Sequence, residues 1–346
     1  MTVPRRGPMR RLALMCVLVM ASTCAPSMPE DVAGDTDAPT RAVVAAERFL
    51  DDYLGPDGRV RRVDQGGDTV SEGQAYAMLL AVALGDEQRF REAWAWTDTH
   101  LQRADGLLGW HWSGGRLTDA GAATDADLVA AWALGLAGKR FADAELAQEA
   151  RRIGAAVIGS ETVRAGAGRV LVAGPWAIGK RVVNPSYLVV EAMSQLWWLT
   201  GDATWSTVAA SARRVLDEQT DGAPHLPSDW ATVDGAAAPS PDGVGPRFSY
   251  DAGRTIVQLA ADCNEAGRAM AARPWTFFES LDIDDIVASY SLSGQPIGSD
   301  RHPMSLVAAA AAAHAAGDEQ HPTYYGAAWI ALGRILLDTR RLGGCG

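Results

Sequence analysis

The chain has 346 residues, of which 48% are hydrophobic and 21% are charged, ordinary proportions for a globular protein with a substantial core. That length allows one large domain or two small ones. The formal net charge of -11 argues against a nucleic-acid partner, because phosphate binding needs a basic surface. A neutral polymer is compatible with this charge. The 12 Trp residues are informative, because the flat indole ring stacks well on the apolar face of a sugar.

The N-terminus is typical of an export signal. Four Arg residues precede an apolar run from Leu12 to Ala21, which is shorter than the roughly 20 residues of a transmembrane helix. We therefore expect a signal peptide over residues 1–25, a secreted or cell-envelope protein, and no transmembrane anchor. Cys24 lies where a lipoprotein cysteine would lie, although Thr23 is unusual before such a cysteine. A lipid anchor at Cys24 therefore stays open.

Residues 26–40 are rich in Pro, Asp, Gly and Thr, and we expect a flexible leader over residues 26–43, followed by one domain over residues 44–340. Signal cleavage removes Cys16 and leaves Cys263 and Cys345 as a pair in an oxidising compartment. This favours a disulfide that ties the C-terminal tail to a helix, with two free thiols as the alternative. No Cys or His spacing predicts a zinc site, and we expect no metal and no cofactor.

Apolar residues recur at helical spacing through most of the mature chain, and no sustained alternation of apolar and polar residues predicts a major sheet. Short strands are predicted near Val170–Val172 and Val182–Val183. The predicted helices span Glu72–Leu84, Glu87–Leu101, Ala126–Ala137, Ala142–Ile158, Pro185–Leu199, Ala203–Gln219, Ala252–Asp262, Pro303–Ala316 and Tyr324–Asp338.

A weak repeat marks the connections between the predicted helices. Gly85, Gly138, Gly201 and Gly317 each follow one helix and precede another, where Gly suits a left-handed C-cap and a following Asp suits the next N-cap. They recur about every 55–60 residues, except for one interval about twice as long, with Cys263–Gly267 near its middle. This period predicts helical hairpins in an α/α toroid, whose long loops line a cleft at one end. An ordinary bundle would not explain the long loops at 102–124, 159–184 and 220–250.

Two acidic segments lie where a loop meets a helix. In the first, Ser71 is a suitable N-cap that places Glu72 in the first helical turn. In the second, Asp125 and Asp127 stand one residue apart at the start of an apolar helix. Each segment alone is explained by a helix start, with an acid stabilised by the helix dipole or with Thr124 or Asp125 as the cap. A cluster of such acids near a buried site would raise the pKa of one of them.

A third segment repeats this pattern. Asp251 opens a helix directly after Tyr250, and Arg254 follows on the same face, which a cap and an intrahelical ion pair would also explain. Together, the three segments favour glycoside hydrolysis, which needs a protonated acid and a base on opposite sides of the bond. In inverting enzymes these groups are roughly 6.5–9.5 Å apart. Glu72 and Asp251, from distant helices that face one cleft, suit these two roles.

The order and approximate spacing of five segments resemble glycoside hydrolase family 8. The resemblance runs from about residue 44 to about residue 338. It implies an all-α (α/α)6 barrel of six inner and six outer helices, an inverting mechanism and no metal requirement. Members of the family act on cellulose, lichenan, chitosan or β-1,4-xylan. The segments are Ser71-Glu72-Gly73-Gln74, Asp105-Gly106-Leu107-Leu108, Ala123-Thr124-Asp125-Ala126-Asp127, Asn184-Pro185-Ser186-Tyr187, and Ser249-Tyr250-Asp251-Ala252 with Arg254.

The resemblance assigns the three catalytic carboxylates. Glu72 matches the general acid that protonates the leaving oxygen, and Asp251 matches the base that activates the water. The Tyr-Asp context of Asp251 is similar to the subgroup with an Asp base, which holds many endoglucanases. Asp125 matches the acid that grips the distorted sugar next to the cut, and Asp127 remains an alternative for part of that role.

The resemblance also implies residues around these carboxylates. Tyr187 and Tyr250 match partners of the water and the base, and Arg254 matches a charge partner near the acid. Gly253 departs from relatives, which often carry a larger residue there, so the local packing beside the base is expected to differ.

Four Trp residues lie in predicted loops, where a core role is harder to explain than in a helix. Trp110, Trp112, Trp176 and Trp230 are therefore candidates to stack on sugar rings, with Trp110 and Trp176 foremost. Those within predicted helices are expected in the core, namely Trp132, Trp197, Trp198 and Trp329.

The leading hypothesis is a monomeric, endo-acting, inverting hydrolase of a β-1,4-glucan such as cellulose. The alternatives are a chitosanase or β-1,4-xylanase of the same family, and a non-catalytic glucan-binding protein on the same scaffold. The presence of all three carboxylates counts against the last alternative. A role in degradation and a role in support of cellulose synthesis both remain open.

Overall fold

The computed structural model of the chain describes residues 40–166, 168–312, 323–337 and 342. The predicted signal peptide, Cys24, Cys345 and most of the predicted leader lie outside these residues. The first helix begins at Arg41, so residues 41–43 are helical and belong to the domain instead of the leader. No helix in the described part of the chain is long and apolar enough to cross a bilayer.

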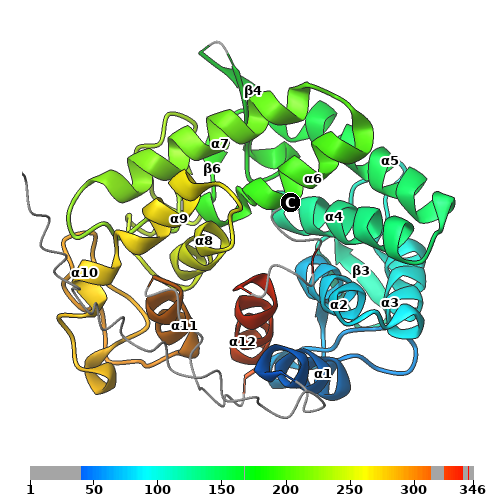
Figure 1. Ribbon diagram of the computed structural model, residues 1–346, viewed down its shortest axis with the longest axis horizontal. Helices are drawn as coiled ribbons and strands as arrows, with labels where there is room; N and C mark the ends of the chain where they lie inside the picture. The colour runs from blue at the N-terminus through cyan, green and yellow to red at the C-terminus, as the bar shows by residue number, and fades with distance from the viewer. Residues whose placement is uncertain (1–39, 167, 313–322, 338–341, 343–346) are drawn as a thin grey trace, which may run out of the picture. The chain divides into compact units, whose positions relative to one another are not determined.

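Helices alternate between an inner and an outer layer around a common centre (Figure 1). The outer helices are α1 (Arg41–Tyr53), α3 (Glu87–His100), α5 (Ala144–Ser160), α7 (Thr204–Asp221) and α9 (Glu265–Ala272), which is followed by the short α10 (Trp275–Phe278). The inner helices are α2 (Ser71–Leu84), α4 (Thr124–Arg140), α6 (Val190–Thr200), α8 (Tyr250–Ala260), α11 (Pro303–Ala312) and α12 (Tyr324–Leu337).

The inner helices close into a ring, which confirms the predicted α/α barrel. Along this ring α2 packs on α4, α4 on α6, α8 on α11, α11 on α12, and α12 on α2. Between α6 and α8 the ring is closed by the 3-10 turn Pro185–Tyr187, which packs on α4 and α8. α1 packs on both α2 and α12, so it covers the place where the two ends of the barrel meet. Only Thr323 is described between α11 and α12, because residues 313–322 lie outside the described part of the chain. No outer helix is therefore described there.

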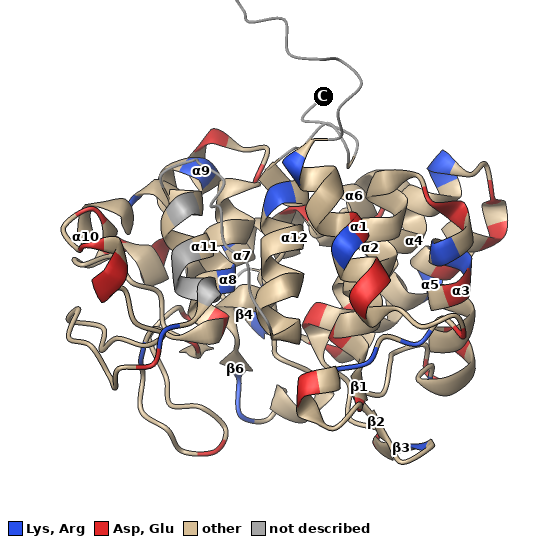
Figure 2. Ribbon diagram, turned by 90° about the horizontal axis from the view of Figure 1, so that it is seen from below, with Lys and Arg blue, Asp and Glu red and all other residues tan. Residues whose placement is uncertain are grey.

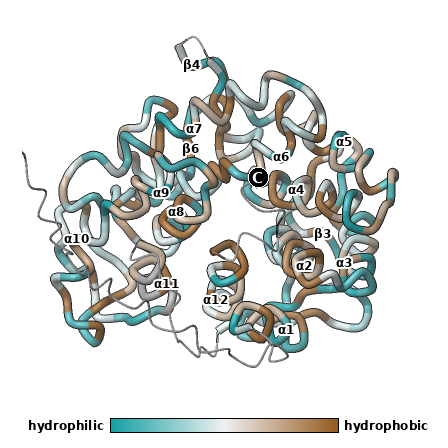
Figure 3. Tube along the Cα trace, viewed as in Figure 1, coloured by the Kyte–Doolittle hydropathy of each residue, from teal (hydrophilic) through white to brown (hydrophobic). Residues whose placement is uncertain are grey.

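Burial separates the two layers in the way their sequences predict. Nearly every residue of α2 is buried, because the helix itself carries apolar or small side chains around most of its circumference. The outer helix α5 instead buries a stripe at helical spacing, Leu146, Ala150, Ile153 and Val157. Figure 3 shows this difference, with hydrophobic colours dominating α2 and hydrophilic turns in α3 and α5.

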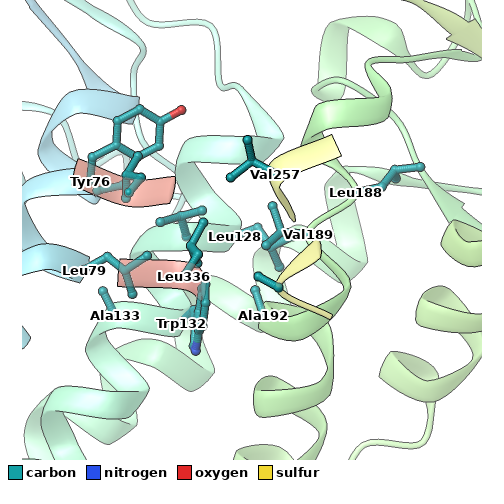
Figure 4. Packing of buried hydrophobic residues seen from close by; sticks show 14 of the residues in the cluster. Tyr76, Leu79, Leu128, Trp132, Ala133, Leu188, Val189, Ala192, Val257 and Leu336 are labelled. Atoms are coloured by element: carbon teal, nitrogen blue, oxygen red, sulfur yellow. The ribbon is translucent and has the colours of Figure 1, made fainter. Parts of the chain in front are cut away.

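The core lies where the inner helices converge (Figure 4). Trp132 of α4 is buried there and Trp329 of α12 is 1% exposed, which confirms both as core residues. The side chains labelled in Figure 4 come from α2, α4, α6 and the two residues before it, α8 and α12. They are Tyr76, Leu79, Leu128, Trp132, Ala133, Leu188, Val189, Ala192, Val257 and Leu336.

Trp197 and Trp198 of α6 do not lie in the core, so that prediction is wrong. They are 39% and 74% exposed. The buried face of α6 carries Ala192, Met193 and Leu196. The two residues that follow Leu196 point away from this face, because successive residues of an α-helix are about 100° apart.

The repeated Gly residues end helices at two of the predicted positions. Gly85 and Gly201 are left-handed C-caps of α2 and α6, with φ of 78° and 69°. Gly138 instead lies inside α4, where a Cβ would stand 2.8 Å from the backbone N of Ala147 in α5. This Gly therefore serves the close approach of two helices and not a helix end. Gly317 lies outside the described residues.

The predicted fifth turn joins α8 to α9. Asn264 caps α9 by accepting a hydrogen bond from the backbone N of Ala266 at 2.9 Å. Cys263 in this turn is disulfide-bonded. Its predicted partner, Cys345, lies outside the described residues.

Helix α6 begins five residues later than the sequence predicts. Asn184 accepts a hydrogen bond from the backbone N of Ser186 at 3.1 Å and starts a separate 3-10 turn, Pro185–Tyr187. The other 3-10 turns are Val63–Gln65, Pro175–Ala177 and Ile283–Asp285.

Short strands gather in the loops at one end of the helices, where Figure 2 shows β1–β3 and β6. β1 (Thr69–Val70), β2 (His111–Ser113) and β3 (Arg116–Asp119) form an antiparallel sheet. β4 (Thr162–Ala165) pairs with β5 (Gly168–Leu171), and β6 (Val182–Val183) pairs with β7 (Ala231–Thr232), which confirms both predicted strands. These strands fix the loops from which α2, α4 and the turn before α6 start.

Candidate active site

The three acidic segments come together at one end of the barrel. Glu72, Asp125 and Asp251 are each the second residue of an inner helix, α2, α4 and α8 respectively. Each lies in a first turn, where unpaired backbone N–H groups and the helix dipole favour negative charge. The caps differ from prediction, because Val70 and Ala123 occupy the N-cap positions and neither makes a side-chain capping bond.

One buried guanidinium joins the three carboxylates. Arg254 Nη1 lies 3.0 Å from Asp125 Oδ2 and 3.5 Å from Glu72 Oε2. Its Nη2 lies 2.6 Å from Asp251 Oδ1. The predicted role of Arg254 as a charge partner near the acid therefore agrees with the geometry. Because the Arg254 side chain is only 3% exposed, these contacts are poorly screened by water.

Two partners of this cluster were not assigned a role from the sequence. Asn184 Nδ2 donates to Asp251 Oδ2 at 2.7 Å, so both oxygens of Asp251 are held. Arg254 Nη1 also donates to the Tyr76 hydroxyl at 3.1 Å. The spacing of Tyr76 four residues after Glu72, on the same face of one helix, could have identified it. The face of the Tyr187 ring lies 5.4 Å from the Arg254 guanidinium.

The surroundings of Glu72 favour its protonated form. Burial raises the pKa of Glu72 to about 7, with the charges of Asp125 and Asp251 acting in the same direction and Arg254 opposing them. Burial also raises the pKa of Asp125, again against the charge of Arg254. The Glu72 side chain nevertheless remains 24% exposed, so it can reach a ligand. A protonated carboxyl at this position can donate a proton near neutral pH.

An open cleft runs past Asp251. A cavity of about 400 Å³ is lined by Glu72, Asp251, Tyr187 and Tyr250, among others. A second cavity of about 330 Å³ shares Tyr250 and Asp251 with the first and adds Trp230. The two cavities therefore adjoin at Tyr250 and Asp251, and together they are called the cleft below. A larger cavity of about 1020 Å³ lies at the other ends of α2 and α4 and contains none of the three carboxylates.

Asp127 does not face this cleft. It is 0% exposed, and its Oδ1 accepts a hydrogen bond from the backbone N of Leu108 at 2.7 Å. Burial raises the pKa of Asp127 well above the usual value, and burial together with the charge of Asp127 also raises the pKa of Glu161. Asp127 thus ties the start of α4 to the turn that precedes Trp110. This burial removes Asp127 from the substrate-binding set predicted from the sequence.

Trp176 and Trp230 form an aromatic row beside the cleft. Their ring centroids are 6.2 Å apart, and Trp230 lies 6.4 Å from Tyr187. Trp176 is 44% exposed at the outer end of this row. Lys180 Nζ lies 5.9 Å from the centroid of the Trp176 ring, and the exposed part of this ring can stack on a sugar ring.

The other two candidate Trp residues differ from each other. Trp110 is 39% exposed and stacks on His111 at 4.9 Å. Trp112 is packed against Trp96 and His100 at 5.5 Å and 4.8 Å. Trp112 therefore packs the sheet against α3. Neither residue lines the cavity that contains Glu72.

The described residues contain no group of three or more His, Cys, Asp or Glu side chains arranged to hold a metal ion.

The barrel brings a carboxyl with a raised pKa and a second carboxyl to one cavity, which is the pair of acids that a glycoside hydrolase needs. The sequence profile of glycosyl hydrolases family 8 matches residues 1–324, and the chain belongs to this family.

Individual relatives agree with this assignment. The chain is 38% identical over 213 residues to a probable endoglucanase of Novacetimonas hansenii. This match covers 59% of this chain and 62% of that protein. It is 32% identical over 228 residues to an endoglucanase of Cellulomonas uda, covering 63% of each. It matches the structure of an endo-β-1,4-glucanase from Acetobacter xylinum with a TM-score of 0.76 and 31% identity, over 86% of this chain and 98% of that chain. The chain thus spans less than two thirds of the length of these two curated relatives.

Proposed function

We propose that this protein is an endo-acting, inverting hydrolase of β-1,4-glucan chains. The observation that carries the proposal is the Arg254-centred cluster, in which a protonated Glu72 and an Asp251 held by Asn184 face one cleft. The printed names of the relatives, endoglucanases and an endo-β-1,4-glucanase, support the linkage. Two adjoining cavities meet at Asp251, and space beyond a single sugar site favours cuts within a chain over removal of end units.

In the proposed reaction, Asp251 takes a proton from a water molecule, which attacks the anomeric carbon of the sugar. Glu72 gives its proton to the glycosidic oxygen as the bond between that oxygen and the carbon breaks. The new hydroxyl lies on the opposite face of the ring, so the configuration inverts. Exchange with solvent then returns a proton to Glu72 and removes one from Asp251.

The separation of the two carboxyls in the cluster does not exceed the range of an inverting enzyme, and the family match supports inversion. The contacts of 3.5 Å and 2.6 Å to opposite nitrogens of one guanidinium keep Glu72 and Asp251 on the two sides of Arg254. Their nearest oxygens are therefore no farther apart than the roughly 9.5 Å upper limit for this class. Asp125, paired with the same Arg at 3.0 Å, is proposed to grip the sugar at the cut.

A substrate panel tests the polymer. Equal masses of carboxymethylcellulose, xylan and chitosan are incubated with the protein, and reducing ends are measured. We expect release from carboxymethylcellulose to exceed that from the other two by at least about tenfold, since ~1.4 kcal/mol of transition-state binding suffices for this. Preferential release from xylan or chitosan would replace the proposed substrate and keep the family. Binding of cello-oligosaccharides without any product would favour a non-catalytic protein.

We further propose that the protein is exported and that residues 1–25 are removed as a signal peptide. The Arg-rich start and the short apolar run support this. N-terminal sequencing and mass measurement of the protein from the cell exterior test it, and a diacylglyceryl mass on Cys24 would mark a lipid anchor. A protein found only inside the cell with Met1 intact would contradict the proposal.

A further inference from the structure

The first turn of α8 is capped by a carboxylate from a distant loop. Ser249, at the N-cap position, makes no capping bond with its own hydroxyl. Instead, Asp229 Oδ1 accepts hydrogen bonds from the backbone N–H groups of Ser249 and Ala252 at 2.9 Å and 3.0 Å. Asp229 Oδ2 accepts from the Ser249 hydroxyl at 2.7 Å. Asp229 thus does what an N-cap residue normally does, from 20 residues away along the chain.

The loop that carries Asp229 is itself fixed to α7. Gln219 Oε1 accepts from the backbone N of Ser228 at 2.8 Å, and its Nε2 donates to the carbonyl of Gly235 at 2.6 Å. Both Gln219 and Asp229 are 8% exposed, so these bonds lie largely out of water. Through this path the outer helix α7 holds the first turn of the inner helix α8.

Asp251 lies within the turn that Asp229 holds, between the two backbone N–H groups that it binds. A shift of this turn would move the Asp251 carboxylate relative to Glu72, and a misplacement of ~1 Å can cost about 10²-fold in rate. We propose that Asp229 is a positioning residue for Asp251, which fixes the first turn of α8 and places a second negative charge beside the base. The inference rests on the proposed role of Asp251 as the base.

The charges around Asp229 make this role sensitive to pH. Burial and the charge of Asp251 raise the pKa of Asp229 to about 6, against the hydrogen bonds from Ser249 and Ala252. The other groups that face it are Arg247 of the same loop region, whose Nε lies 3.7 Å away, and Tyr325 of α12. An ionised Asp229 favours proton transfer from water to the carboxylate beside it, because like charges disfavour one another.

Two substitutions separate the effect of Asp229 on the position of the first turn of α8 from the effect of its negative charge. Asp229→Asn keeps an oxygen that can accept from both N–H groups but removes the charge. Asp229→Ala removes both. A matched control is Asp86→Asn, because Asp86 caps the outer helix α3 by accepting from the backbone N of Arg89 at 3.0 Å, away from the cleft. kcat and KM on soluble β-1,4-glucan are measured from pH 4 to 8, together with the thermal midpoint.

For Asp229→Asn we expect kcat to fall about threefold to tenfold and the acidic limb of the pH profile to move about half a unit lower. For Asp229→Ala we expect a fall of about a hundredfold in kcat, with KM within about twofold. The Asp86→Asn control keeps a capping oxygen, so it should leave the thermal midpoint, kcat and the pH profile close to those of the wild type. The inference would be overturned if Asp229→Asn kept the wild-type kcat with an unmoved acidic limb. It would also be overturned if the Asp86→Asn control lost as much kcat as Asp229→Ala. An inactive wild type would instead contradict the proposed function itself.

Discussion

At the scale of single residues, the site depends on one cation among three acids. If all three carboxylates were ionised, their negative charge would exceed the single positive charge of Arg254. The excess negative charge is reduced when Glu72 keeps its proton. The general acid and the charge partner are thus two parts of one electrostatic arrangement. Glu72 has to be protonated to act, and its pKa of about 7 predicts that activity is present below that pH and lost above it.

Substitution of Arg254 tests this arrangement. In Arg254→Gln, removal of the positive charge should raise the pKa of Glu72 further, so the alkaline limb of the kcat profile should move to higher pH. Its kcat should fall at least about a hundredfold, because Asp125 and Asp251 lose their partner.

Arg254→Lys is the matched variant, since it keeps the charge and loses the planar fork that holds two carboxylates. Its kcat should also fall, while its alkaline limb should stay within a few tenths of a unit of the wild type. An alkaline limb that moves to lower pH in Arg254→Gln would contradict the assignment of that limb to Glu72.

At the scale of elements, the start of α2 is built for close packing. A Cβ on Gly73 would lie 2.4 Å from the Tyr324 hydroxyl, so only Gly lets α12 approach the helix next to Glu72. Gln74 accepts from the backbone N of Val60 at 2.5 Å and donates to Thr97 Oγ1 at 2.9 Å, which ties this turn to the preceding loop and to α3. The turn that carries Glu72 is therefore held by contacts of Gly73 and Gln74, the two residues that follow it.

Gly73→Ala should consequently displace Tyr324 and the first turn of α2. We expect a loss of about 1–3 kcal/mol in the free energy of unfolding, as for other overpacked sites, and a fall in kcat. Gly159→Ala is the matched control, because Gly159 lies in the outer helix α5 with nothing within 4 Å of an added Cβ. The free energy of unfolding of Gly159→Ala should rise by about 0.5–1 kcal/mol. Denaturant unfolding of both variants measures this, and equal stability in the two would contradict the packing argument.

At the scale of the whole molecule, the sequence predicts the barrel and its three acids, because helical spacing, helix starts and acidic motifs are local signals. It does not reveal what fixes those acids. Asp229 acts on α8 across 20 residues of loop, and Asp127 turns away from the cleft toward Leu108, although it stands only two residues after Asp125. Trp197 and Trp198 were misplaced for a related reason, since helical membership alone does not say which face of α6 is buried.

The central claim, that Glu72 protonates the leaving oxygen in an inverting cut of a β-1,4-glucan, is tested most directly by the anomer of the first product. Proton NMR during early hydrolysis of a cello-oligosaccharide should show the α-anomer before mutarotation, and Glu72→Gln should reduce its rate of appearance by at least about a thousandfold. A β-anomer as the first product, or a Glu72→Gln variant that retains wild-type activity, would contradict the account.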